Sequence, residues 1–145
     1  MDKKYEPLRL QNQLCFPLYA ASREIVKKYT PSLEKLDLTY TQYITMMVLW
    51  EEQEISAKAL GEKLFLDSGT LTPVLKALEK KGFVIRARSK ADERTLIVSV
   101  TPEGMQLREQ ALAVPAAISG CIDIEPEEAG ELYHILYKIL GREKL

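Results

Sequence analysis

Residues 56–100 read SAKALGEKLFLDSGTLTPVLKALEKKGFVIRARSKADERTLIVSV, and this stretch decides the fold. Ser56 suits the N-cap of a short helix over 57–64, because its hydroxyl can accept a hydrogen bond from a free amide of the first turn. Asp67 caps a second helix over 69–81, which ends in Lys-Lys-Gly, a typical helix C-terminus. Two helices joined by so short a turn predict a helix-turn-helix.

A β-hairpin follows this motif directly. Residues 83–88 and 95–100 each alternate between two sets of side chains, as strands do, and the loop over 89–94 between them is charged. A hairpin placed after a helix-turn-helix is a wing. The sequence therefore predicts a mainly α fold with a small β-hairpin wing, the winged helix-turn-helix.

Helices are also expected on both sides of this unit. Apolar residues recur every three or four positions along 10–29, which predicts one long amphipathic helix, kinked at Pro17 where a backbone donor is missing. A Thr-Pro pair is expected to open a short helix over 30–36. A Thr-x-x-Gln capping box then opens a largely buried helix over 39–52.

Two further helices are expected after the hairpin. A Thr-Pro-Glu motif at 101–103 caps one that runs to about residue 118, and Glu-Pro-Glu at 125–127 starts the last. The predicted architecture is a winged helix-turn-helix flanked by N- and C-terminal helices.

The charge of the chain is distributed unevenly. The formal net charge is only -1, but residues 76–94 hold seven basic and three acidic residues, a net charge of +4. Residues 121–131 hold five acids and no base. This asymmetry places a cationic surface on one part of the molecule and indicates double-stranded DNA as partner. A solvated charged helix face is the competing interpretation of the basic run.

Several classes of function lack support in the sequence. His134 is the only histidine, and CxxC, HExxH, GxSxG and phosphate-loop motifs are absent, which argues against a metal site, a cofactor and an enzyme. The longest apolar run, 44–50, is too short to cross a bilayer, and the N-terminus lacks the features of a signal peptide. We therefore expect a cytoplasmic protein with no membrane partner.

The expected DNA-reading surface combines the start of the second helix with the wing. Hydroxyls and free amides at a helix N-terminus suit bases and phosphates, and an arginine at a wing tip suits the narrow minor groove. An adjacent carboxylate can hold such an arginine in place. The candidate residues are Ser68, Thr70, Thr72, Pro73, Lys76, Arg86, Arg88, Lys90, Asp92 and Arg94. The alternative is that the hydroxyls are only helix caps and the loop only a solvated turn.

Four segments resemble one known family. Residues 67–73 (DSGTLTP) and 92–94 (DER) are similar to the recognition helix and wing of the MarR regulators. Residues 13–16 (QLCF) and 38–43 (LTYTQY) resemble its organic hydroperoxide-sensing branch, the OhrR regulators. The resemblance covers nearly the whole chain and departs at Thr41, where relatives often carry proline.

The resemblance implies a homodimer that represses by occupying a palindromic operator. The implied organisation is a single MarR-type chain over 1–145, with the winged helix-turn-helix DNA-binding part at 38–100 and dimerisation helices at 8–36 and 101–145.

The resemblance also implies a redox sensor. It assigns Cys15 as the thiolate that an organic hydroperoxide oxidises to a sulfenic acid, with Tyr29 and Tyr40 as its hydrogen-bond donors and Tyr19 in the same network. Tyr29 lies fourteen residues after Cys15, or about 21 Å along a helix, so it must come from the other subunit if the two meet. On periodicity alone, Cys15 could equally be a small buried residue.

Cys121 has two possible roles. Some relatives carry a second cysteine near this place that forms an intersubunit disulfide with the sensing one, whereas others cap the sulfenic acid with a small thiol. Both remain open from the sequence, as do two other functions. One is a MarR regulator released by a phenolic or antibiotic-like ligand, and the other is a thiol peroxidase that uses Cys15.

Overall fold

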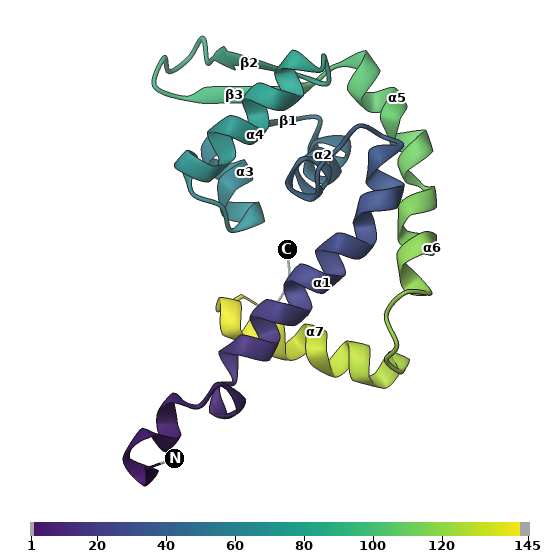
Figure 1. The fold of residues 1–145 in the computed structure, drawn as a ribbon. Coiled ribbons are helices and arrows are strands. Elements are labelled where there is room, and N and C mark those ends of the chain that lie inside the picture. Colours follow the sequence, from purple (N-terminus) through teal and green to yellow (C-terminus); the bar gives the residue numbers. More distant parts are fainter. Residues whose placement is uncertain (1, 143–145) are drawn as a thin grey trace.

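The computed structural model describes residues 2–142, so residue 1 and residues 143–145 of the expected 1–145 chain lie outside the description. Helices α2, α3 and α4 and a small sheet form a lobe at the top of Figure 1. The long helix α1 (Cys15–Glu34) runs diagonally downward from this lobe. Helices α5 and α6 descend on the right, and α7 crosses beneath the lobe.

The helices of the lobe begin where local capping predicts. Helix α2 (Tyr40–Glu52) starts with the expected capping box, in which Gln42 N donates to the Thr39 hydroxyl at 3.3 Å and Thr39 N donates to Gln42 Oε1 at 3.1 Å. Helix α3 (Ala57–Leu64) is capped by Ser56, and α4 (Ser68–Lys80) by Asp67. These predictions are confirmed, because a cap depends only on residues within one helical turn.

The wing contains one more strand than the sequence predicts. Strands β2 (Val84–Arg88) and β3 (Leu96–Val100) form the expected hairpin. Strand β1 (Glu54–Ser56) adds to the free edge of β3, giving an antiparallel sheet in the order β1-β3-β2. Its three residues are too few to show an alternating pattern, so periodicity could not predict this strand.

The core lies between α2, α4, the sheet and α5. Met46, Leu49 and Leu78 are completely buried there. Trp50 Nε1 donates to the Gly104 carbonyl at 2.8 Å and so ties α2 to the start of α5 (Pro102–Ala111). A Cβ at Gly104 would lie 2.4 Å from the Phe83 carbonyl oxygen, so only glycine permits this close packing.

The predicted course of the first helix is wrong in three places, the first of which is its start, at Cys15 instead of about residue 10. Helix α1 begins at Cys15, so Pro17 lies in its first turn, where amides have no helical acceptor and proline leaves the helix intact. The helix also continues through Pro31, so no new helix starts at residue 30. Burial of Leu33 in the core favours this continuation, and the exposed Lys27 carbonyl that loses its donor can bind water instead.

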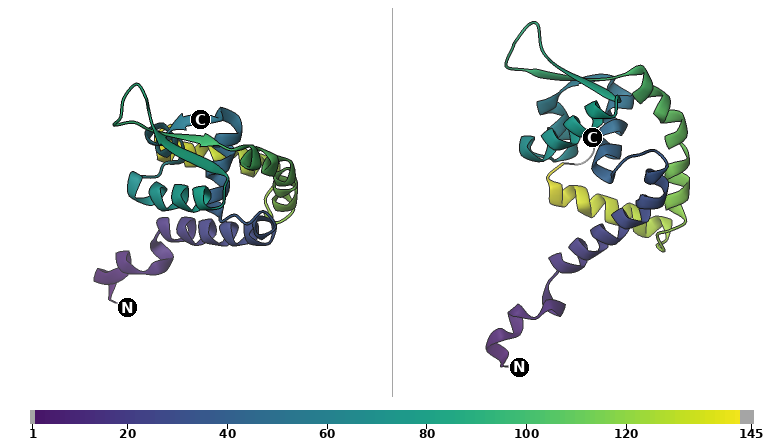
Figure 2. Two further views of the ribbon diagram at one scale, coloured as in Figure 1. Left: turned by 90° about the horizontal axis from the view of Figure 1, so that it is seen from above. Right: turned by 45° about the horizontal axis from the view of Figure 1, so that its top comes forward.

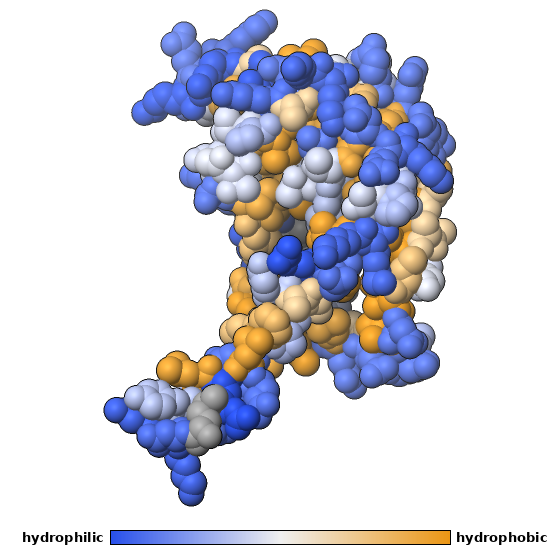
Figure 3. Space-filling model, in the orientation of Figure 1, coloured by the Kyte–Doolittle hydropathy of each residue, from blue (hydrophilic) through white to orange (hydrophobic). Residues whose placement is uncertain are grey.

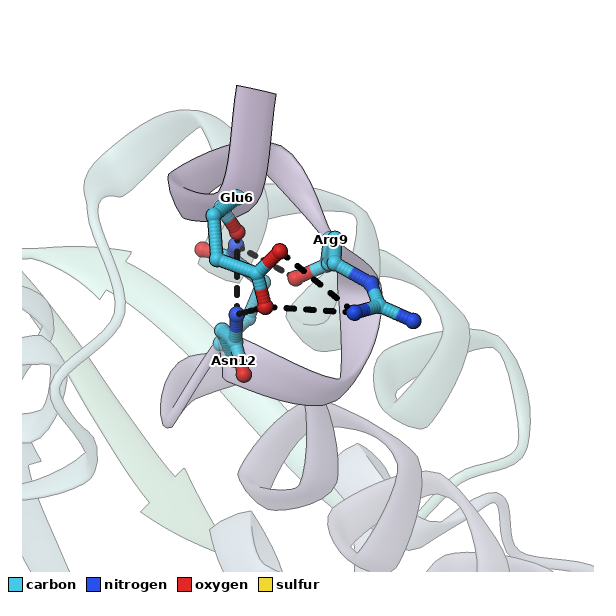
Figure 4. Close-up of polar contacts among 4 residues, drawn as sticks. Glu6, Arg9 and Asn12 are labelled. Carbon is cyan, nitrogen blue, oxygen red and sulfur yellow. Dashed lines mark hydrogen bonds and ion pairs between the residues drawn. The ribbon is translucent and has the colours of Figure 1, made fainter. Parts of the chain in front are cut away.

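Residues 2–14 form an arm that projects from the rest of the chain (Figures 1 and 2). It consists of two 3-10 turns, Lys3–Leu8 and Leu10–Asn12. Polar contacts fold it locally, since Glu6 pairs with Arg9 at 3.1 Å and Asn12 Nδ2 donates to the Glu6 carbonyl at 2.9 Å (Figure 4). Its apolar side chains are exposed to solvent in the single chain, and Leu14 is 85% exposed.

The C-terminal helices also differ from the prediction. The single helix expected up to residue 118 is two helices, α5 and α6 (Ala113–Ser119), which meet at Leu112. Pro115 explains the break, because restarting the helix at Ala113 places this proline in a first turn. Helix α7 (Pro126–Leu140) begins as predicted, with Glu125 and Glu128 forming a capping box.

An apolar surface extends from the arm to α7. We define it by side chains that are at least 42% exposed, namely Leu8, Leu10, Leu14, Phe16, Leu18, Leu132, Ile135, Ile139 and Leu140. Figure 3 shows hydrophobic side chains along the arm and the start of α1, whereas the wing is mainly hydrophilic. A patch of this kind marks a surface that another molecule covers. No helix in the described part of the chain is long and apolar enough to cross a membrane.

Candidate DNA interface and thiol site

The N-terminus of α4 presents its polar side chains to the outside. Asp67 accepts from Thr70 N at 2.7 Å, and this hydrogen bond holds the pKa of the Asp67 carboxyl below its usual value. The Thr72 hydroxyl donates to the Ser68 carbonyl at 2.7 Å, so towards a ligand it can only accept. The expected recognition residues Ser68, Thr70, Thr72, Pro73 and Lys76 are all exposed on this helix.

The tip of the wing holds Arg94 beside Asp92, as the sequence predicts. Arg94 Nε lies 3.4 Å from Asp92 Oδ1, and the Arg94 backbone amide donates to the same oxygen at 3.0 Å. The Thr95 hydroxyl donates to the other carboxylate oxygen at 3.4 Å. Asp92 thus orients the Arg94 side chain at its Nε atom. The side chain is 93% exposed, so its guanidinium can enter a DNA groove.

Arg86, another candidate DNA-binding residue, pairs with an acidic side chain of α4. Its Nη2 lies 3.1 Å from Glu79 Oε1, and its backbone amide donates to Glu79 Oε2 at 3.1 Å. Its Nε is buried without a hydrogen-bond partner in the described part of the chain. The pair attaches strand β2 to α4 in the free chain, and the DNA-binding role expected for Arg86 stays a prediction. Arg88 and Lys90, further along the wing, are exposed.

The Glu79–Arg86 pair predicts a pH dependence. Hydrogen bonds from the Arg86 guanidinium and amide hold the pKa of Glu79 below its ordinary value of 4.5. A carboxylate whose pKa is lowered by folding stabilises the fold fully at pH values above its unfolded pKa. This contribution is lost as the pH falls through the lower pKa of the folded state. The free energy of urea unfolding should therefore decrease less between about pH 5 and pH 3 in Glu79→Gln than in the unmodified chain. An equal decrease of the unfolding free energy over this pH range in both proteins would contradict this prediction.

The thiol of Cys15 is exposed at the start of α1. Tyr19, one turn further on, is also exposed, and its hydroxyl accepts from Arg23 Nη1 at 3.2 Å. Tyr29 lies three more turns along the same helix. The structure thus brings Tyr19 near Cys15 within one chain but keeps Tyr29 away from it, as the helix geometry requires.

Tyr29 and Tyr40, which we call the phenol pair, lie together at the other end of α1. Their ring centroids are 5.0 Å apart in an edge-to-face arrangement. Burial, followed by the proximity of Tyr29, raises the pKa of Tyr40, so this phenol keeps its proton at neutral pH. A protonated phenol can donate a hydrogen bond to a thiolate.

Sequence reasoning missed a third tyrosine in this cluster. The Tyr43 ring centroid lies 5.9 Å from that of Tyr29 and 6.4 Å from that of Tyr40. It also lies 6.4 Å from that of Trp50 in the core. Tyr43 and Tyr40 are three residues apart on α2, and this spacing was the available signal that they share a face. Tyr43 connects the phenol pair to the core of the lobe.

Cys121 lies in the connection between α6 and α7. It is exposed, and its Sγ donates to the Ala117 carbonyl at 3.2 Å. The start of α1 lies far from the connection between α6 and α7 in Figures 1 and 2. A disulfide between Cys15 and Cys121 would therefore join two chains. Within residues 2–142, no group of three or more His, Cys, Asp or Glu side chains is placed to hold a metal ion.

Comparisons with known proteins agree with these features. The family model of the transcriptional regulators SarA/Rot matches residues 27–110. The organic hydroperoxide resistance transcriptional regulator of Bacillus subtilis (strain 168) is 45% identical over 140 residues, which cover 97% of this chain and 95% of the relative.

Solved structures of AbfR, a Staphylococcus epidermidis protein, are also similar. Reduced AbfR bound to DNA is 40% identical with a TM-score of 0.78, covering 95% of this chain and 94% of AbfR. AbfR in its disulfide form is 41% identical with a TM-score of 0.65, covering 94% of this chain and 96% of AbfR.

Proposed function

Because this chain belongs to the organic hydroperoxide resistance branch of the MarR-family regulators, we propose that it is a homodimeric repressor that releases a palindromic operator when an organic hydroperoxide oxidises Cys15. The observation that carries this proposal is the position of Cys15. It is exposed at the edge of the apolar surface, one helix length from the phenol pair of its own chain. A second copy that covers this surface can supply the missing phenols.

DNA contact is assigned to the N-terminus of α4 and to the wing. The exposed hydroxyls of α4 and Lys76 enter the major groove, and Arg94, oriented by Asp92, enters the adjacent minor groove. Arg88 and Lys90 contact phosphates, whereas Arg86 maintains the angle between wing and recognition helix. That reduced AbfR is bound to DNA in a solved structure supports DNA as the partner.

The sensing step is a two-electron oxidation. The Cys15 thiolate attacks the distal oxygen of the hydroperoxide, forming an S–O bond while the O–O bond breaks. The sulfur becomes a sulfenic acid, and the peroxide leaves as an alkoxide that takes up a proton to give the alcohol. Hydrogen bonds from the partner's Tyr29 and the partner's Tyr40 stabilise the attacking thiolate.

We further propose that Cys121 of the partner resolves the sulfenic acid. Its thiolate attacks the Cys15 sulfur, so that an S–S bond forms, the S–O bond breaks, and hydroxide leaves as water after protonation. The disulfide form of AbfR supports this route. Closing the bond needs the two α-carbons within about 7 Å. We propose that reaching this distance moves α1 of one chain against α7 of the other and changes the spacing of the recognition helices, which has to match about one DNA turn.

Cys121→Ser tests the resolving step. One equivalent of cumene hydroperoxide should convert the unmodified protein to a covalent dimer on a non-reducing gel, whereas Cys121→Ser should remain a monomer band that a sulfenic acid reagent labels. Covalent dimers of equal yield in the variant would contradict the role of Cys121. A monomer band in the unmodified protein would favour a small-thiol cap.

The experiment that tests the function is a gel-shift titration with operator DNA. Reduced protein should bind tightly and lose its DNA on addition of an organic hydroperoxide. Release by a phenolic compound while both thiols remain reduced would identify a ligand-controlled regulator instead. Sustained peroxide consumption with a reductant would indicate a thiol peroxidase, whereas a regulator that is not an enzyme stops after one oxidation per subunit. As a DNA-binding regulator, the protein works in the cytoplasm.

A further inference from the structure

The end of α7 contacts the turn of the helix-turn-helix. Gly141 has a φ of 77° and turns the chain away from the helix axis, which brings the next residue, Arg142, against the lobe. Arg142 Nη1 donates to the Glu62 carbonyl at 2.9 Å. Its guanidinium carbon lies 4.5 Å from the centroid of the Phe65 ring, within cation–π range.

The contacted residues are Glu62 in the last turn of α3 and Phe65 in the turn that leads to the recognition helix. Phe65 ends α3 in a left-handed conformation with a φ of 55°, which is unfavourable for a residue with a side chain and persists only where its surroundings hold it. The turn is also tight, since a Cβ at Gly61 would lie 2.7 Å from the Leu66 carbonyl oxygen. Arg142 is therefore bound to a strained element two residues before the N-cap of α4.

Arg142 and the recognition helix line the same cavity. This cavity has a volume of about 700 Å³ and lies between α3, α4 and residues 94–96 of the wing. Ser68 and Thr72 of the recognition helix lie on its wall together with Arg142. The contacts of Arg142 with Glu62 and Phe65 lie on this open side of the helix start and add a restraint there.

The other end of α7 leads to the second thiol. Cys121 precedes Pro126, the first residue of α7, by five positions. The helix has 15 residues, which corresponds to about 22 Å. In Figure 1 the helix starts beside α6 and ends below α3. A single rigid element thus extends from the segment of Cys121 to the turn before α4.

We propose that Arg142 is a positioning residue that holds this turn in the geometry needed for operator binding and transmits a movement of α7 to the recognition helix. The inference rests on the proposed function for its DNA and redox consequences. The contact itself can be tested on the free protein.

Hydrogen exchange without DNA tests the contact. The Phe65 and Leu66 amides donate to the carbonyls of Glu62 and Gly61 at 3.4 and 2.9 Å. In Arg142→Ala these two amides should exchange about tenfold faster. Lys138→Ala removes the same charge from the exposed last turn of α7 and should leave their exchange unchanged. Unchanged exchange in Arg142→Ala would overturn the inference.

Operator affinity tests the consequence. Reduced Arg142→Ala should bind about tenfold more weakly than Lys138→Ala with the same salt dependence, because no phosphate contact is lost. Arg142→Lys should recover little, since lysine lacks the planar group that stacks on Phe65. Equal affinities in Arg142→Ala and Lys138→Ala would overturn the inference. So would a salt slope lower by about 1 in Arg142→Ala than in Lys138→Ala, which would make Arg142 a phosphate ligand.

Oxidation provides the last readout. It should accelerate exchange of the Phe65 and Leu66 amides in the unmodified protein and add nothing in Arg142→Ala. Oxidation that leaves their exchange unchanged while releasing the operator would overturn the proposed transmission. If the unmodified protein neither binds nor releases an operator, the proposed function fails, and the exchange of the reduced free protein still decides whether Arg142 holds the turn.

Discussion

Cys15→Ser should bind its operator as tightly as the reduced parent protein and should keep it bound in organic hydroperoxide. In the parent, one equivalent of cumene hydroperoxide should weaken binding by about 5- to 150-fold, the range of typical coupling free energies. The difference arises because serine has no thiolate to attack the O–O bond, while its size and its exposed place at the start of α1 leave the fold unchanged. The measurement is a gel-shift titration at fixed salt, because protein–DNA affinity depends strongly on salt.

Cys121→Ser is the matched control for this variant. It removes the other exposed thiol but leaves the sensing atom in place, so it should still form the sulfenic acid when oxidised. Release that persists in Cys15→Ser would remove the sensing role from this residue. Release that disappears only in Cys121→Ser would move the sensing role to the other end of α7.

Arg94→Ala should weaken operator binding by about 1–3 kcal/mol. Its guanidinium is almost fully exposed at the wing tip and is oriented by Asp92, so little free energy is needed to immobilise it in the minor groove. The loss should be largest for operators with A·T-rich minor grooves, which are narrow and most negative in potential. Asp92→Asn should show a smaller loss of the same kind, because Arg94 remains but is held less firmly.

Arg88→Ala controls for the loss of one positive charge on the same wing. It should weaken binding to all sequences alike and lower the salt slope by about 1, as expected for a phosphate contact. Unchanged affinity in Arg94→Ala would favour the alternative interpretation, in which Arg94 is part of a solvated turn and does not contact DNA. An equal, sequence-independent loss in Arg88→Ala and Arg94→Ala would show that the wing contacts only the backbone.

Local signals in the sequence predicted much of the lobe. The bounds of α3 agree with the predicted helix over 57–64 because Ser56 caps it within one turn, and Gly82 has the left-handed φ of 85° expected after α4. The carboxylate beside Arg94 was also predictable, since the two residues are only two positions apart. In each case the determining interaction lies within a few residues.

Interactions between distant segments account for the errors. The kink expected at Pro17 depended on where α1 begins, and the apolar side chains of the arm before it are exposed in the single chain. The pairing of Arg86 with Glu79 joins a strand to a helix. The contact between Arg142 and Glu62 spans 80 residues. No periodicity or spacing reports such contacts, because they form only when the elements pack.

The phenol pair illustrates a different limit. Its place relative to Cys15 followed from the length of α1, whereas we propose that a second chain completes the site. The central claim is therefore that the thiol of one chain is activated by tyrosines of the other.

Mixed dimers test this claim most directly. A dimer of one Cys15→Ser chain and one Tyr29→Phe chain contains a complete site only if the thiol and the phenol come from different chains. The measurement is the rate at which the one remaining Cys15 thiol reacts with cumene hydroperoxide. We predict the rate of the unmodified protein. A rate equal to that of the Tyr29→Phe homodimer would contradict the account.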